Sequence, residues 1–304
     1  MAKKAFLFPG QGSQYVGMAK DLFEKSIEAK EMIKTADDLL AVNLSYIMFN
    51  GPEEELKQSE YTQPAIFLHS VILASIIRIL EADATAGHSL GEYSAYVASG
   101  AIQFHEAIKL VRSRGIAMQE AGDKNKGTMA AVIGLELEKV ETLCEEASSA
   151  GIVQCANFNS PGQIVISGSF DGVRKAMELC KNAGAKLVKE LVVSAAFHSP
   201  LMIPAQEKFK PALDKTNFYE PKFPVYANVT AKPVTGIPEI KIKLYEQITA
   251  SVRWDETIRN MIDDGVEEFY EIGPGNVLQG LLKRHYPDVR RFGINKFEDV
   301  EKYL

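Results

Sequence analysis

The pentapeptide at residues 87–91 constrains the fold of this chain more than any other stretch. It reads Gly-His-Ser-Leu-Gly, the Gly-x-Ser-x-Gly form of a nucleophile elbow, in which a serine sits on a strained turn between a strand and a helix. A short, mostly apolar run precedes it at residues 83–86, and residues 92–98 favour a helix. We expect one glycine to relieve the φ/ψ demands of the turn and the other to let the helix pack closely. Ser89 is the predicted nucleophile.

The outer parts of the chain alternate strands and helices. This order predicts a largely parallel sheet covered on both faces, the core of an α/β, hydrolase-like domain. The expected strands are residues 4–8, 223–228, 268–272 and 291–294. The expected helices are 64–80, 104–121 and 202–214, two pieces within 239–264, and one that follows Gly275 and ends at His285. For the helix at 64–80 we expect Thr62 or Gln63 near the cap and Pro64 in the first turn.

A different order occupies the middle of the chain. Residues 128–133, 152–157, 163–167 and 186–193 are expected strands, 138–150 and 171–183 expected helices, and 159–162 a turn. The resulting βαββαβ order predicts a ferredoxin-like arrangement. We therefore expect an inserted small subdomain at 125–195, within a discontinuous hydrolase-like core formed by 1–124 and 196–304.

Composition excludes several classes of protein. A net charge of −6 argues against a general nucleic-acid or anionic-membrane binder. The run at 64–80 is interrupted by polar residues and Arg78, which indicates a buried core helix and no membrane span. Three cysteines without metal-ligand spacing are typical of reduced thiols, so we expect a cytoplasmic protein without a signal peptide, metal or cofactor. The cysteines are Cys144, Cys155 and Cys180.

A serine hydroxyl needs a base within hydrogen-bond reach, and the chain has only five histidines. His198 is favoured, because it ends an apolar run and precedes Ser199 and Pro200, which can begin a helix. Such strand-to-helix junctions are where open α/β sheets place their sites. His285 stays an alternative, since hydrolases place their histidine late in the chain. The others have structural interpretations: His69 in a core helix, His88 directed away from its neighbour Ser89, and His105 at a helix surface.

One arginine lies on an apolar helix face. Ala107, Val111 and Met118 form the apolar stripe, and Arg114 falls within it. A buried guanidinium cannot lose its charge and must find an anion. Two explanations remain open here, a structural salt bridge and a bidentate clamp for a substrate carboxylate. A serine, a histidine and this arginine together indicate transfer of an acyl group that ends in a carboxylate.

These residues resemble the malonyl-CoA:acyl carrier protein transacylases of bacterial fatty-acid synthesis over essentially the whole chain. The matching blocks, in order, are Phe-Pro-Gly-Gln-Gly-Ser-Gln at 8–14, Gly-His-Ser-Leu-Gly-Glu at 87–92, Arg-Ser-Arg-Gly at 112–115 with Met-Gln at 118–119, Asn-Phe-Asn-Ser-Pro-Gly at 157–162, Ala-Phe-His-Ser at 196–199 and Glu-Ile-Gly-Pro-Gly at 271–275.

The resemblance implies a role for each site residue. Ser89 attacks the thioester of malonyl-CoA and His198 takes its proton, in a ping-pong reaction through a covalent serine ester. Arg114 pairs with the malonyl carboxylate. The remaining residues assist: backbone N–H groups of Gln11 and Leu90 form the oxyanion hole, the main-chain carbonyl of Gln247 orients the imidazole, and Phe197 is the malonyl-selective form of its motif.

The expected partners are malonyl-CoA and holo acyl carrier protein, with no obligate oligomer implied. Alternatives are a hydrolase that releases the acyl group to water, an acyltransferase serving a polyketide synthase, and a degenerate relative that only binds. Acyl carrier proteins are typically acidic, so local positive charge is expected to dock them. Two groups are candidates: Lys181, Lys186 and Lys189 in the small subdomain, and Lys283 with Arg284 near the C-terminus.

Overall fold

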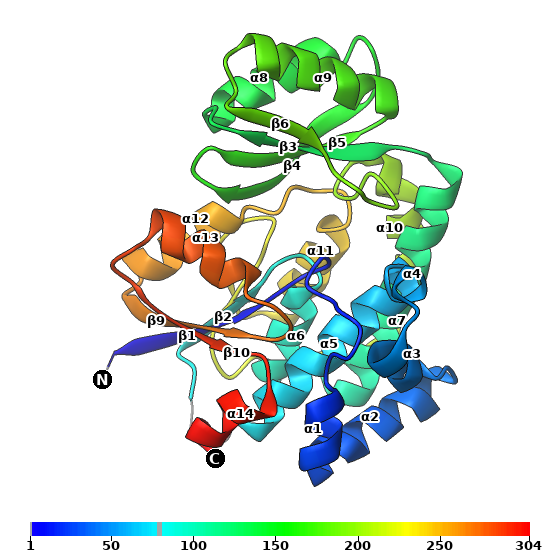
Figure 1. Ribbon diagram of the computed structural model, residues 1–304, viewed down its shortest axis with the longest axis vertical. Helices are drawn as coiled ribbons and strands as arrows, with labels where there is room; N and C mark the ends of the chain where they lie inside the picture. Colours follow the sequence, from blue (N-terminus) through cyan, green and yellow to red (C-terminus); the bar gives the residue numbers. More distant parts are fainter. Residues whose placement is uncertain (1, 78–80) are drawn as a thin grey trace.

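The computed structural model describes residues 2–77 and 81–304 and contains two β-sheets (Figure 1). In the six-stranded sheet all neighbours run parallel except the last pair, β7 and β8. Its spatial order is β10 (Arg290–Ile294), β9 (Val266–Ile272), β1 (Lys3–Phe8), β2 (Ala84–Gly87), β7 (Val225–Tyr226) and β8 (Pro233–Val234). The mixed α/β fold class with a mostly parallel sheet is confirmed.

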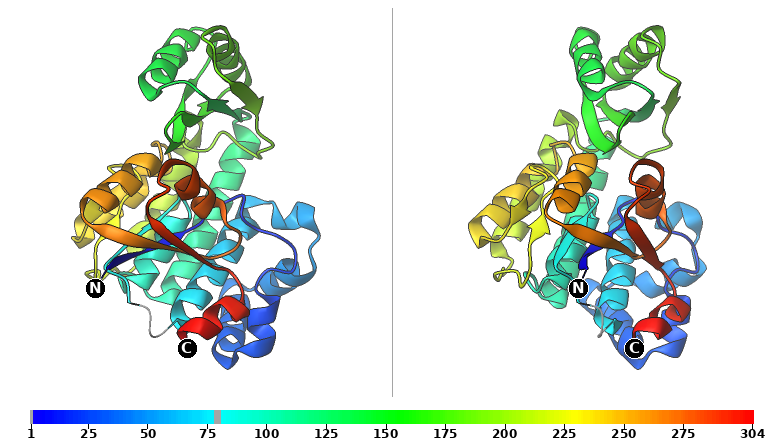
Figure 2. Two further views of the ribbon diagram at one scale, coloured as in Figure 1. Left: turned by 60° about the vertical axis from the view of Figure 1, so that its left-hand side comes forward. Right: turned by 90° about the vertical axis from the view of Figure 1, so that its left-hand side faces the viewer.

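The second sheet is antiparallel and four-stranded. Its order is β4 (Val153–Ser160), β5 (Gln163–Gly168), β3 (Thr128–Ile133) and β6 (Leu187–Glu190). With α8 (Leu137–Ala147) and α9 (Phe170–Asn182) it follows the expected βαββαβ order. In Figure 2 this unit stands at one end of the molecule, beyond the larger sheet. The division of the chain at residues 125 and 195 remains a prediction.

The remaining helices belong to the larger part. They are α1 (Lys20–Lys25), α2 (Ile27–Leu40), α3 (Leu44–Asn50), α4 (Glu53–Leu56), α5 (Ser59–Ile76), α6 (Gly91–Ala98), α7 (Phe104–Lys124), η1 (Pro200–Met202), α10 (Ile203–Lys215), α11 (Ile237–Glu246), α12 (Trp254–Asp263), α13 (Val277–His285), α14 (Phe297–Val300) and η2 (Glu301–Tyr303). Among the described residues, no helix is both long and apolar enough to cross a membrane.

Strand alternation places β1 between two cores. Ala5 and Leu7 pack with Trp254 and the other apolar residues of α12 and α13 on one face. Phe6 and Phe8 point to the other face and join the core formed with α5, α6 and α7. Because successive side chains of a strand face opposite sides, a continuous apolar strand fits a sheet that is covered twice. The small sheet uses the same rule: Ala130 and other inward residues pack under α8 and α9 with the three cysteines, all of which are free and buried.

Two expected boundaries are wrong, both near loops that shape the site. The expected strand 223–228 is reduced to β7, because the chain leaves the sheet so that the Asn228 amide can bond Gly87 O at 2.7 Å. The expected strand 186–193 ends at Glu190, and Val192 beyond it is exposed. In addition, the expected turn at 159–162 is shorter, because β4 continues to Ser160.

The start of α5 also differs from expectation. The helix begins at Ser59, so Pro64 lies inside it and neither Thr62 nor Gln63 is a cap. Proline cannot donate to the carbonyl four residues earlier. That carbonyl, Glu60 O, accepts instead from Arg112 Nη1 of α7 at 2.5 Å. A side chain from another helix therefore satisfies the group that the proline leaves free. Of the expected run 64–80, residues 78–80 lie outside the described residues.

The elbow glycines have a purpose that differs in part from the expectation. Neither Gly87 nor Gly91 has a positive φ; Ser89 itself takes the left-handed conformation, with φ 50°. A Cβ on Gly87 would lie 1.8 Å from the carbonyl carbon of Gly91, and a Cβ on Gly91 would lie 2.1 Å from Phe8 O. The expected relief of φ/ψ by a glycine is therefore wrong, while the expected close packing is confirmed. Both glycines give room for α6 to approach the strands.

We expect Gly91→Ala to lower the free energy of unfolding by about 1–3 kcal/mol or to prevent folding, because backbone atoms that cannot move aside oppose the added methyl. Gly280→Ala is the matched control. Gly280 is exposed in α13 with nothing within 4 Å of its built Cβ, so alanine there stabilises by about 0.4–1 kcal/mol. Urea unfolding of both variants measures the difference. Equal stability of the two variants contradicts this assignment.

Candidate active site

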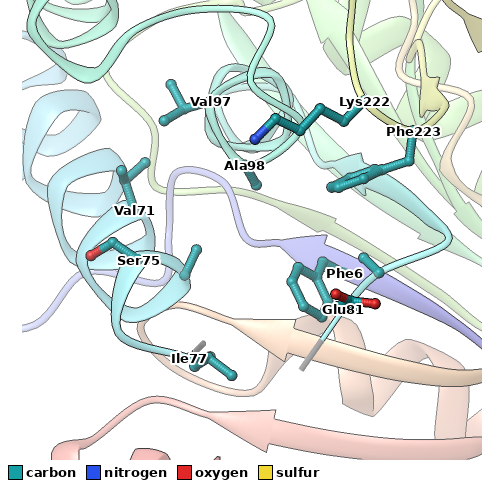
Figure 3. Close-up of a pocket in the computed structure, with 11 residues that line it drawn as sticks. Phe6, Val71, Ser75, Ile77, Glu81, Val97, Ala98, Lys222 and Phe223 are labelled. Atoms are coloured by element: carbon teal, nitrogen blue, oxygen red, sulfur yellow. The ribbon is translucent and has the colours of Figure 1, made fainter. Parts of the chain in front are cut away.

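A cavity of about 930 Å³ lies between the two sheets. Its floor is formed by residues that follow the carboxyl ends of β1 and β2, where open α/β sheets place their sites. Met129, Asn157 and Val165 of the small sheet line the opposite wall. The predicted residues that line it are Gln11, Ser89, Leu90, Arg114, Phe197 and His198. A second cavity of about 550 Å³ contains none of them; Phe6, Lys222 and Phe223 are among the side chains around it (Figure 3).

Ser89 is held by its backbone, and its hydroxyl contacts two side chains of the cavity. Its N–H donates to Asn228 Oδ1 at 2.7 Å, and its carbonyl accepts from Gln247 Nε2 at 2.9 Å. Its Oγ lies 2.8 Å from His198 Nε2 and accepts from Arg114 Nη2 at 3.1 Å. The left-handed backbone at Ser89 is strained for a residue with a side chain. The elbow therefore presents one oxygen to a base and to a cation together.

His198 is oriented by carbonyl groups. Its Nδ1 lies 2.9 Å from Gln247 O and 3.1 Å from Ala250 O, which fixes the proton on Nδ1 and leaves the Nε2 lone pair toward Ser89. His198 also has a positive φ of 54°, and its own carbonyl accepts from Gln154 Nε2 at 2.8 Å. Burial, and next the charge of Arg114, lower the pKa of His198 to about 3. The imidazole is therefore neutral at neutral pH.

Arg114 is buried and surrounded by neutral acceptors. Its Nη1 donates to Gln63 Oε1 at 2.7 Å and its Nη2 to Gln247 Oε1 at 2.9 Å. Its guanidinium carbon lies 5.3 Å from the centre of the Tyr93 ring. Within the described residues no carboxylate lies within ion-pair distance, and Arg114 Nε has no partner. Of the two explanations left open by the sequence, the geometry therefore disfavours the structural salt bridge.

Gln247 contributes more than its carbonyl. The residue is fully buried behind the cavity, and its side-chain amide bonds Arg114, Ser89 O and Glu92 Oε2, the last at 2.7 Å. The main-chain contact to His198 agrees with the geometry that the resemblance implies. The side-chain contacts were not anticipated.

Gln11, Leu90 and Phe197 lie where their expected roles require them. Within the described residues, the backbone N–H groups of Gln11 and Leu90 have no protein acceptor. Leu90 directly precedes α6, where backbone N–H groups point out of the helix. Phe197 is nearly buried beside His198 and lines the cavity.

Among the described histidines, only the ring of His198 is bonded to the Ser89 hydroxyl. His88 bonds Asn159 Oδ1 at 2.9 Å and packs on Trp254, and His69 Nε2 lies 2.7 Å from Asn295 O. His285 ends α13, and the structure gives it no contact with the elbow.

Several residues of the site were missed. Gln63 was interpreted only as a cap and Glu92 only as part of a motif, although both are buried polar residues next to apolar runs. Asn228 and Gln154 gave no periodic signal, because their partners are backbone groups distant in sequence.

The arrangement suits acyl transfer. A neutral imidazole bonded to a serine hydroxyl is the pair required for nucleophilic catalysis, and a buried cation beside it suits an acyl group with a terminal carboxylate. Among the described residues, no group of three or more His, Cys, Asp or Glu side chains is placed to hold a metal ion.

Comparison with known proteins agrees with this chemistry. Residues 5–298 match the family described as acyl transferase domain. The chain is 44% identical over 304 residues to a malonyl CoA-acyl carrier protein transacylase of Bacillus subtilis, covering 99% of this chain and 96% of that protein.

Solved structures of similar proteins superpose closely on this chain. An acyl carrier protein S-malonyltransferase from Vibrio cholerae superposes with a TM-score of 0.95 at 40% identity, covering 100% of both chains. A malonyl-transacylase solved in complex with its type II PKS acyl-carrier protein gives a TM-score of 0.95 at 40% identity, covering 100% of this chain and 99% of the other. The chain therefore belongs to the acyl transferase domain family and, within it, to the malonyl-CoA:acyl carrier protein transacylases.

Proposed function

We propose that this protein transfers the malonyl group of malonyl-CoA to the phosphopantetheine thiol of acyl carrier protein, through a malonyl ester on Ser89, and so supplies extender units for fatty-acid synthesis. One observation carries the proposal: Ser89 Oγ lies within hydrogen-bond distance of both His198 Nε2 and Arg114 Nη2 in a cavity between the sheets. The base explains acyl transfer, and the cation explains why the acyl group is a diacid.

In the first half-reaction the Ser89 hydroxyl attacks the thioester carbonyl carbon while its proton moves to His198 Nε2. The N–H groups of Gln11 and Leu90 receive the charge that develops on the carbonyl oxygen, and each such donor is worth about 3 kcal/mol. As the C–S bond breaks, His198 returns the proton to the thiolate of coenzyme A. A malonyl ester on Ser89 and free coenzyme A result.

The second half-reaction runs through the same groups in reverse. His198 takes the proton of the phosphopantetheine thiol, and the sulfur attacks the ester carbonyl. Ser89 Oγ leaves and recovers the proton from His198. Because each half-reaction exchanges one acyl bond for another, no metal or redox group is needed. The structural neighbour solved with its carrier protein supports a carrier as the acceptor.

The substrate carboxylate also affects the base. The charge of Arg114 is the second cause that lowers the pKa of His198, after burial. A carboxylate placed on the guanidinium offsets that charge and therefore raises the pKa of His198 toward its ordinary value. Malonyl binding then makes His198 a stronger base at the step that needs one. An acetyl group has no such effect.

For the carrier we propose the basic group at the cavity mouth. Lys283 and Arg284 are exposed at the end of α13, Leu281 of the same helix lines the cavity, and Arg284 Nη1 donates to the cavity residue Gln163 at 3.1 Å. Positive charge beside the entrance suits an acidic partner whose prosthetic arm must reach Ser89.

When the protein is given malonyl-CoA and holo acyl carrier protein, we expect it to form malonyl-carrier faster than it releases free malonate. A transferase protects its ester from water until the thiol arrives, whereas a hydrolase does not. Intact-mass spectrometry of protein and carrier over time measures both products, and apo carrier, which lacks the thiol, is the control. Hydrolysis that outpaces carrier formation establishes the hydrolase alternative. Fatty-acid and polyketide carriers tested side by side separate those two pathways.

We expect Arg114→Ala to lower the malonyl-to-acetyl ratio of kcat/KM by roughly 10–100-fold, the effect of losing one hydrogen-bonded charge pair. Arg112→Ala is the matched control. It removes a neighbouring guanidinium of α7 that bonds Glu60 O and its carboxylate outside the cavity. The acylation rates with malonyl-CoA and acetyl-CoA measure the ratio. If Arg114→Ala leaves it unchanged, the arginine does not recognise the carboxylate.

We expect His198→Ala to slow formation of the Ser89 adduct by about 10²–10⁴-fold, as loss of a general base does. His285→Ala is the control, because it removes the histidine that chain order kept as an alternative. Rapid-quench mass spectrometry of the adduct measures both rates. A large loss in His285→Ala with none in His198→Ala reverses the assignment.

A further inference from the structure

Among the described residues, Glu92 contributes the carboxylate of the buried polar cluster behind Ser89. Glu92 is fully buried on α6, and its Oε2 accepts from Gln247 Nε2 at 2.7 Å and from Asn228 N at 3.0 Å. On its other side the same Gln247 amide accepts from Arg114 Nη2 at 2.9 Å. One neutral amide therefore connects a buried carboxylate to a buried guanidinium.

The direction of the Gln247 amide follows from its partners. Its NH₂ faces Glu92 Oε2 and Ser89 O, which both accept, and its oxygen faces Arg114, which only donates. Turning the amide over would oppose donor to donor and acceptor to acceptor. The amide dipole is therefore aligned between the two charges and stabilises both.

Charge balance makes Glu92 the counter-charge of Arg114. A buried guanidinium needs negative charge nearby, yet the hydrogen-bond acceptors around Arg114 are amide oxygens and a hydroxyl. Glu92 supplies that charge through Gln247. Burial raises the pKa of Glu92 to about 7, against the hydrogen bonds and Arg114, which lower it. The carboxyl group thus gains and loses its proton near neutral pH.

The groups around Glu92 do not change their protonation near neutral pH. Arg114 of α7 stays charged, and Tyr93 and Tyr96 of α6 stay neutral because burial raises the pKa of each phenol. His198, across Ser89, stays neutral above pH 7 even when malonyl binding raises its pKa, because burial lowers that pKa from an ordinary value of 6.5.

The elements packed around α6 add no further titrating group. In the described part of the chain, α5, β1, β2 and β7 place no charged side chain against the Glu92 carboxyl group. Glu239 of α11 acts on Tyr96 and not on Glu92.

A malonyl carboxylate on Arg114 brings a second negative charge to one guanidinium. Two carboxylates that share a buried cation cannot both stay ionised without cost, so one of them binds a proton. The substrate carboxylate contacts the guanidinium directly, whereas Glu92 acts through an amide. Glu92 Oε1, whose partner is the Tyr96 hydroxyl at 3.4 Å, is the oxygen left to receive the proton.

We propose that Glu92 is the counter-charge of Arg114 in the free enzyme and takes up one proton from solvent when the malonyl carboxylate binds the guanidinium. This inference rests on the proposed function. Glu92 thereby acts as a positioning residue that keeps the charge of the site balanced in both states. No bond other than the O–H bond on Glu92 forms in this step.

The proposal makes malonyl loading of Ser89 depend on pH. A carboxyl group whose pKa rises on malonylation binds a proton at pH values above its free-state pKa of about 7. Malonyl loading therefore weakens as pH rises above 7, by at most tenfold per pH unit. Below pH 7 Glu92 already holds its proton, and the dependence disappears. Acetyl loading brings no carboxylate and lacks this dependence.

Proton uptake during acylation tests the proposal. Wild-type protein is mixed at pH 7.5 with malonyl-CoA in weakly buffered indicator solution, and the adduct on Ser89 is counted by intact-mass spectrometry. We expect about 0.5–1 proton per malonyl adduct and none per acetyl adduct. In Glu92→Gln we expect no uptake, because one amide oxygen can accept from Gln247 and Asn228 while the titrating group is gone. Glu268→Gln removes another buried carboxylate, bonded to Tyr270 and Arg290, and is expected to behave as wild type.

The outcomes separate the two proposals. A malonyl adduct without proton uptake in the wild type, or equal uptake in wild type and Glu92→Gln, overturns the role of Glu92 alone. Absence of any adduct on Ser89 overturns the proposed function and this inference with it. If Glu92→Gln does not fold, the pH dependence of the wild-type ratio of malonyl loading to acetyl loading tests the proposal. A ratio that stays constant from pH 7 to pH 8.5 contradicts the proposal.

Discussion

The guanidinium of Arg114 cannot be neutralised, and the protein nevertheless buries it completely. Helix α5 turns Gln63 toward it, the loop after α11 turns Gln247 toward it, and the elbow turns Ser89 Oγ toward it. Segments that are far apart in sequence thus meet at one cation. Buried charges destabilise unless their donors are satisfied, so these contacts also fix how the segments pack. The Nε–H of Arg114 has no partner among the described residues, so the protein itself completes the polar cluster only in part.

Sequence patterns indicated the groups that are proposed to react, but not the groups that hold them. The Gly-x-Ser-x-Gly turn indicated Ser89, the apolar stripe of α7 indicated the burial of Arg114, and the strand-to-helix junction indicated His198. Each of these signals is local. Asn228 and Gln154 contact backbone atoms more than forty residues away, and no local pattern records such a contact. The error at Pro64 has the same origin, because a side chain of α7 supplies the missing donor.

The small sheet affects the chemistry through more than the shape of the cavity. Gln154 of β4 donates to the carbonyls of His198 and Thr249, at 2.8 and 3.0 Å. It therefore links the peptide that carries the imidazole to the loop whose carbonyls orient Nδ1. His198 has a positive φ, which a residue with a side chain keeps only when its surroundings impose it. The small sheet thus helps to position His198, the proposed base, whereas Ser89, the proposed nucleophile, follows a strand of the large sheet.

Under the proposed function, selectivity for a diacid follows from electrostatics as well as from fit. In the free site the guanidinium and the imidazole lie on either side of one hydroxyl, and the positive charge opposes protonation of His198. An acyl group without a carboxylate leaves that opposition in place, so it meets a weak base even when it enters the cavity. Under the two proposals, a malonyl group offsets this effect by binding Arg114, and Glu92 takes up a proton in response. Under the two proposals, recognition of the substrate and activation of the base are therefore one electrostatic event, because the substrate carboxylate binds a guanidinium whose direct hydrogen-bond partners are uncharged.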